Sequence, residues 1–206
     1  GVSCLHLKAH ADAEAALRTV LDREPGHLDT LDKLASLLER SDRADAALPL
    51  RREWVRRNGV RVDPCRGDRQ ARVLLLGAAG PYNLPAQKLL DRDRFESVVL
   101  YLPPLPETLD LGYIDPLARD CDIVFNAVAN PDHAVALAPQ IDAIGRMLGR
   151  PLLNPPAKIA GTARDAIARL LADVPGLLVP PTRQVDRSEL AALAAAGPTF
   201  QQQLVR

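Results

Sequence analysis

Three polar side chains follow one apolar run of the chain closely enough to act on a single ligand. Asn126 is the last residue of the segment 121–126, which has the composition of a buried strand, and Asn130 and Asp132 follow it closely. Side-chain amides and carboxylates at such a position can hydrogen-bond a small molecule in a crevice. They can equally form turns that satisfy nearby backbone groups, and both interpretations are open. The working hypothesis is that all three contact a substrate.

Asn83 and Asn154 lie in loops after two other apolar runs, and we predict both as substrate contacts as well. Gly77-x-x-Gly80 precedes Asn83, but this spacing is not the dinucleotide fingerprint and lacks the Lys-Ser/Thr of a P-loop. It favours a tight turn over a phosphate-binding loop. His133 follows Asp132, and a single histidine at a helix start is more often polar surface than a base. The spacing of the other polar residues predicts neither a metal site nor a catalytic triad.

The composition excludes some partners from the leading hypotheses. The chain has 206 residues, a net charge of zero and 47% hydrophobic residues. A neutral chain has no strong electrostatic attraction for nucleic acid or anionic membrane, so we expect neither partner. The three cysteines, Cys4, Cys65 and Cys121, show no metal or disulfide spacing, which is typical of a cytoplasmic protein. No apolar run is long enough to span a bilayer and no signal peptide is apparent.

Residues 71–206 have the pattern of an α/β domain. Apolar runs at 72–76, 97–102 and 121–126 predict strands, and residues 84–91 and 131–148 have helical spacing, with Asn83 and Gly149 as the predicted cap residues. Residues 152–182 read as a strand, a helix and a second strand, closed by Pro180-Pro181. This alternation predicts a Rossmann-like, mostly parallel, doubly wound sheet. Its crevice loops would be residues 77–83, 126–132 and 154–162.

Residues 1–58 predict helices instead, because apolar residues recur every three or four positions. Ala13, Leu17 and Pro25 match Ala46, Leu50 and Asn58 at a spacing of 33 residues, so the segment resembles the tetratricopeptide repeat, whose period is about 34 residues. A plain helical hairpin is the alternative. Residues 59–70, which are rich in Gly, Pro and Asp, are predicted as a linker between the two parts.

Three segments together resemble a known family. They are Phe125-Asn126-Ala-Val, Asn154-Pro-Pro-Ala-Lys-Ile-Ala-Gly-Thr-Ala-Arg-Asp165 and Val174-Pro-Gly-Leu-Leu-Val-Pro-Pro-Thr182. Through these segments, residues 70–206 resemble the pre-ATP-grasp domain of ATP-grasp enzymes. The resemblance is greatest to a bacterial group in which tetratricopeptide repeats precede this domain. Residues 200–206 resemble the first strand of the ATP-grasp module.

The resemblance implies a function and its cofactors. Such enzymes use ATP and Mg²⁺ to activate a small-molecule carboxylate and join it to an amine. The pre-ATP-grasp domain lines one wall of the substrate site, and Arg164 occupies a position from which a basic residue can contact nucleotide phosphates. The catalytic module would follow residue 206, so we expect this fragment to bind no ATP or Mg²⁺ and to be inactive alone. The natural chain is also expected to begin before Gly1.

Two other functions remain open from the sequence. Helical repeats joined to a Rossmann-like domain also occur in nucleotide-sugar glycosyltransferases, which would need a second Rossmann-like half. A non-enzymatic scaffold would use the helical repeats to bind a protein partner.

Overall fold

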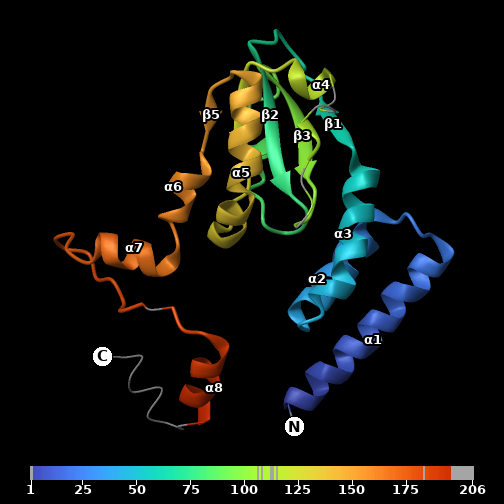
Figure 1. Cartoon of the computed structure of the whole chain (residues 1–206), viewed down its shortest axis with the longest axis vertical. Helices are drawn as coiled ribbons and strands as arrows, with labels where there is room; N and C mark the ends of the chain where they lie inside the picture. Colours follow the sequence, from blue (N-terminus) through green and yellow to red (C-terminus); the bar gives the residue numbers. More distant parts are fainter. Residues whose placement is uncertain are drawn as a thin grey trace.

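The chain forms an α/β structure in which helices precede and flank a mixed, mostly parallel sheet of five strands (Figure 1). This computed structural model describes residues 2–105, 107, 109–111, 114, 116–182 and 184–195. The predicted strand at 200–206 lies outside the described residues. The predicted helices at the amino end and the three predicted strands of the α/β part are all present.

The amino-terminal helices are α1 (Val2–Arg23), α2 (Leu28–Arg40) and α3 (Ala44–Asn58). The side chain of His27 caps α2 by accepting a hydrogen bond from the backbone N–H of Thr30. Four buried apolar side chains of α2 and α3 form a small core with three partly buried leucines of α1 and α3. The buried residues are Leu34, Ala35, Leu38 and Ala47, and the partly buried ones are Leu17, Leu21 and Leu50. The amphipathic pattern therefore predicted these helices correctly, and the repeat identity stays a prediction.

The sheet has the strand order β1-β3-β2-β4-β5. Its strands are β1 (Val60–Asp63), β2 (Ala71–Ala78), β3 (Phe95–Leu102), β4 (Ile123–Asn126) and β5 (Leu152–Leu153). Among the described strands, β1 alone runs antiparallel, along the edge of β3. Part of the predicted linker is thus a strand, because the alternating Val60 and Val62 pack against the sheet. From the central β2 the chain goes first to β3 on one side and then to β4 on the other.

The two faces of the sheet are covered unequally. Leu74, Leu76, Val98 and Val124 are buried on the face that packs against α5 (Pro131–Leu148) and α4 (Pro116–Arg119). On the other face, Val73, Leu75 and Val99 pack against the short 3₁₀ helix η1 (Ala86–Lys88). Helix α5 and both of its ends were predicted correctly.

The predicted helix at 84–91 is wrong, and only η1 forms there. Asn83 is not its cap, since its side chain bonds to the preceding turn: Oδ1 accepts from the N–H of Ala78, and Nδ2 donates to the carbonyls of Ala78 and Gly80. The N–H of Leu84 bonds to the carbonyl of Ala127, so the chain crosses the end of β4. In this segment, hydrogen bonds to distant parts of the chain take the place of the hydrogen bonds that a helix would have formed.

The segment after α5 also differs from the prediction. It contains β5, α6 (Pro156–Ala160), α7 (Arg164–Leu171) and α8 (Arg187–Ala195), but no strand at 174–182. Residues 174–182 pair with none of the described strands, and Leu178 is 94% exposed. Apolar composition predicted burial here, although a strand forms only where a partner offers its backbone groups.

Candidate functional site

Asn126 and Asn154, two of the predicted substrate contacts, bind each other's backbone. Asn126 is fully buried, and its Nδ2 donates to the carbonyl of Asn154 at 3.1 Å. Its Oδ1 accepts from the N–H of Val128 at 3.0 Å. Asn154 Nδ2 in turn donates to the carbonyl of Asn126 at 2.9 Å, and Asn154 has a positive φ of 55°. Both amides therefore join the ends of β4 and β5, as the turn interpretation expects.

Asn130 and Asp132 lie at the start of α5. The Asn130 Oδ1 accepts hydrogen bonds from the N–H groups of Asp132 and His133, so Asn130 is the N-cap of the helix. Asp132 is exposed in the first turn, where a carboxylate stabilises the helix dipole. The side-chain hydrogen bonds found for the four predicted asparagines thus all go to backbone groups.

Arg164 is the first residue of α7 and is exposed. Figure 1 shows α7 on the opposite side of the sheet from α2 and α3. The fold brings Asn126 and Asn154 together, with Asn83 nearby through its bridge to Val128, but it places Arg164 apart from them. A ligand contact by any of the six predicted residues therefore stays a prediction.

A cleft lies between the amino-terminal helices and the carboxyl ends of β2 and β3. Its volume is about 310 Å³. Helices α2 and α3 form one wall, and the loops after β2 and β3 with the first turns of α5 form the other. The lining residues are Glu39, Ala44, Asp45, Leu48, Arg51, Ala78, Ala79, Tyr82, Pro103, Pro104, Leu105, His133 and Leu137. Ligands of α/β sheets bind at this edge, so the cleft is the candidate site.

Arg51 holds the helical wall in place. Its side chain is buried, with 3% exposure, and Nε and Nη2 each donate to the Glu39 carboxylate at 2.9 Å. Nη2 also donates to Ser36 Oγ, and Nη1 donates to Asp32. All three guanidinium nitrogens are therefore used inside the protein. Burial alone would lower the pKa of Arg51, but hydrogen bonds from Glu39 and Asp32 raise it, so it is permanently charged.

Tyr82 joins this ion cluster to the sheet. Its hydroxyl donates to Glu39 Oε2 at 3.0 Å, and its ring stacks on His133 with 3.6 Å between ring centroids. Burial acts to raise the pKa of Glu39, but the hydrogen bonds from Arg51 outweigh it and lower that pKa. Burial also lowers the pKa of His133, so at pH 7 its imidazole is neutral and can accept a proton.

The glycines of the first crevice loop have packing roles. Gly80 has a φ of +116°, and an added Cβ would lie 2.8 Å from the Tyr82 ring. A Cβ at Gly77 would lie 3.0 Å from the ring of Tyr101. These geometries account for both glycines as a tight turn and a close approach, in agreement with the preference drawn from their spacing.

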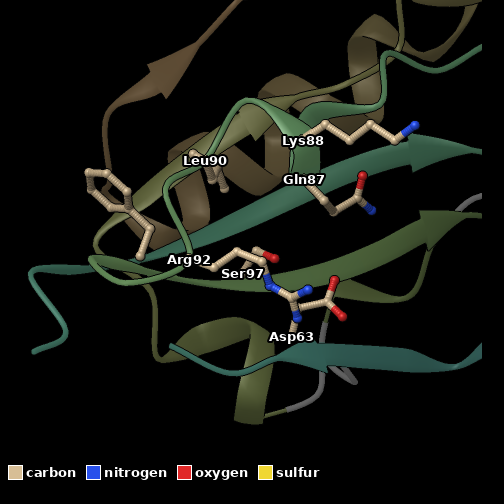
Figure 2. Close-up of a pocket in the computed structure, with 7 residues that line it drawn as sticks. Asp63, Gln87, Lys88, Leu90, Arg92 and Ser97 are labelled. Carbon is tan, nitrogen blue, oxygen red and sulfur yellow. The ribbon is translucent and has the colours of Figure 1, made fainter. Parts of the chain in front are cut away.

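A second pocket, of about 390 Å³, lies at the amino end of β3 (Figure 2). Asp63, Ser97, Lys88 and Arg92 line it, and Figure 2 shows the Arg92 side chain extending across the pocket toward Asp63. Lys88 and Arg92 are exposed. This pocket is larger than the cleft, but it lies away from the carboxyl edge where α/β sheets bind ligands, so the cleft is favoured.

Reading the sequence missed most of the cleft. Asp32, Ser36 and Glu39 are spaced by four and three residues, which puts them on one face of α2. A polar stripe on a helix that also has an apolar stripe, followed by Arg51 in the next helix, could have indicated a buried ion cluster. No local pattern in the sequence indicated that this cluster would pair with Tyr82.

Comparisons with known proteins add no further assignment, since family models, curated proteins and solved structures all return no match. Among the described residues, no three His, Cys, Asp or Glu side chains are grouped so as to hold a metal ion. Within the same part of the chain, none of the helices has the length and apolar character needed to cross a membrane.

Proposed function

We propose that this chain is the substrate-binding part of an ATP-dependent carboxylate–amine ligase of the ATP-grasp type. In this proposal the cleft holds one substrate, while ATP and Mg²⁺ bind to a module outside this chain. The observation that supports it is the position of the cleft at the carboxyl edge of the sheet, walled by the amino-terminal helices.

The strand order strengthens the choice of this edge. The chain reverses direction across the sheet between β2 and β4, as in Rossmann-like sheets, whose ligands bind at such a reversal. Here residues 82–84 cross the reversal point and bond to residues 127–129. Ligand space is thereby shifted toward Ala78, Ala79 and Tyr82, which form the sheet side of the cleft.

The proposal can be tested by a ligand titration that is monitored by NMR. The isotope-labelled chain is titrated separately with free amino acids, with simple amines and carboxylates, and with Mg·ATP. We expect at least one small molecule to shift the backbone resonances of residues 78–82 and 133–137, with no such shifts and no phosphate release from Mg·ATP. ATP turnover by this chain, or shifts in the cleft from Mg·ATP alone, would contradict the proposal.

A matched pair of variants makes the location specific. Ala44 lines the cleft, whereas Ala46 is exposed on the same helix and does not line it. Ala44→Trp should fill the cleft and abolish the shifts, and Ala46→Trp should retain them. Equal loss in both variants would place binding elsewhere.

A further inference from the structure

We infer that the cleft recognises the amine substrate, as a primary ammonium group on a short apolar chain. This inference rests on the proposed function and assigns one of its two substrates to the cleft. Three properties of the cleft carry it: the sign of its available charge, its hydrogen-bond acceptors and its apolar wall.

The positive charge in the cleft is already matched. Arg51 contacts two carboxylates, those of Glu39 and Asp32, and each of its three nitrogens donates to a protein group. A ligand carboxylate would have to displace one of these partners from a buried guanidinium, which leaves a protein carboxylate without its counter-ion. The buried cluster is therefore net negative and disfavours an anion.

The start of α5 offers no alternative anion site. Asn130 already accepts hydrogen bonds from the N–H groups of Asp132 and His133. The N–H of Ala134 bonds to the carbonyl of Asn130, and residue 131 is a proline, which has no N–H. The backbone donors that usually bind an anion at a helix start are thus all used here.

Acceptors remain for a cation. Asp45 lines the cleft, is exposed and makes no hydrogen bond or ion pair with the described residues. It lies in the first turn of α3, on the wall of the cleft that the amino-terminal helices form. Glu39 on α2, in the same wall, keeps 24% of its side chain exposed, and its oxygens already accept three of the roughly four hydrogen bonds that a carboxylate can take. An ammonium group has three donors, which can be shared between these two carboxylates and the Tyr82 hydroxyl oxygen.

The rest of the lining suits the hydrocarbon part of the ligand. Leu48 and Leu137 belong to opposite walls, and residues 103–105 add two prolines and a leucine. The volume of about 310 Å³ lies at the small end of the range for small-molecule sites, about 300–1,000 Å³. The cleft thus matches a short aliphatic amine better than a polar or bulky one.

Three probes of nearly equal size test this assignment: butylammonium, butyrate and neutral butyramide. Each is titrated into the labelled chain at low salt while the resonances of Tyr82, His133 and residues 78–79 are followed. Butylammonium should shift them with a dissociation constant in the millimolar range, and the other two should bind at least several-fold more weakly. Because surface charge pairs are screened, added salt should weaken butylammonium binding.

A pair of charge variants supplies the control. Asp45→Asn should raise the butylammonium dissociation constant by about 2- to 5-fold, the range of an exposed ion pair. Asp12→Asn removes the same charge from an exposed position on α1 that does not line the cleft, and should leave the constant unchanged. Should Asp45→Asn fail to fold, the comparison of the three probes still decides.

The outcomes separate this inference from the proposed function. Butyrate or butyramide binding as tightly as butylammonium, equal effects of the two variants, or binding of carboxylates alone would overturn the amine assignment and leave the ligase proposal standing. Binding of Mg·ATP in the cleft with no response to any of the three probes would overturn both.

Discussion

Replacing Arg51 by methionine should destabilise the protein more than any other single charge removal in the helical wall. The guanidinium is buried and makes hydrogen bonds to Glu39, Asp32 and Ser36. Methionine keeps an apolar stem of similar length, so packing along the stem is largely retained. The loss of unfolding free energy then measures the contribution of the charge and its hydrogen bonds.

The expected magnitude follows from how exposed the partners are. Removing one member of a fully buried ion pair costs about 3–5 kcal/mol, because the other charge stays buried alone. Here Asp32 keeps 38% and Glu39 keeps 24% of its side chain exposed, so water can partly resolvate both carboxylates. We therefore expect about 2–3 kcal/mol. For a chain of this size that lowers Tm by about 4–12 °C.

The assay is urea unfolding, followed by circular dichroism and by the fluorescence of the single tryptophan. Trp54 lies on α3 and contacts Tyr101 of β3 edge-on, with 4.6 Å between ring centroids, so its emission reports the helix–sheet contact. The matched control is Arg52→Met, which removes an exposed pair with Glu107 and should cost less than about 1 kcal/mol. Equal destabilisation by both variants would refute this account of Arg51.

Three further substitutions test other contacts. Asn126→Leu leaves a buried N–H and a carbonyl without partners and should cost about 2–4 kcal/mol in urea unfolding. Gly80→Ala should cost about 1–3 kcal/mol because of its positive φ and contact with Tyr82, whereas Gly161→Ala, which has room for a Cβ, should cost under about 1 kcal/mol. Burial lowers the pKa of His133, so the unfolded chain binds its proton first, and stability falls as pH drops below about 6.5. His133→Gln should reduce that fall between pH 7.5 and 5.5, and an unchanged profile would contradict it.

Local patterns in the sequence were enough to predict several elements. The uninterrupted apolar run Val73–Leu76 indicated a strand buried on both faces, and β2 is such a strand. For α5 the signals were its helical spacing and Gly149 after its last residue, and the left-handed φ of Gly149 ends the helix as expected. In these cases the information needed lies within the element itself.

Errors arose where structure depends on a distant partner. Residues 174–182 have strand-like composition, but they pair with none of the described strands. Asn83 was predicted to cap a helix, but its side chain bonds to Ala78 and Gly80 of the preceding turn. The predicted asparagines lie near the carboxyl ends of the strands, and the hydrogen bonds that their side chains make go to backbone groups. The cleft depends on how α2 and α3 pack on the sheet, which no short-range spacing encodes.

Stability and ligand preference are coupled in this cleft because the same charges serve both. Arg51 needs Glu39 in order to be buried, and Glu39 in turn binds Tyr82, which joins the helices to the sheet. Any variant that removes Glu39 to test ligand charge also leaves Arg51 without a partner and weakens the wall itself. Asp45 has no such structural partner among the described residues. It is therefore the position at which the charge of the cleft can be changed while its shape is kept.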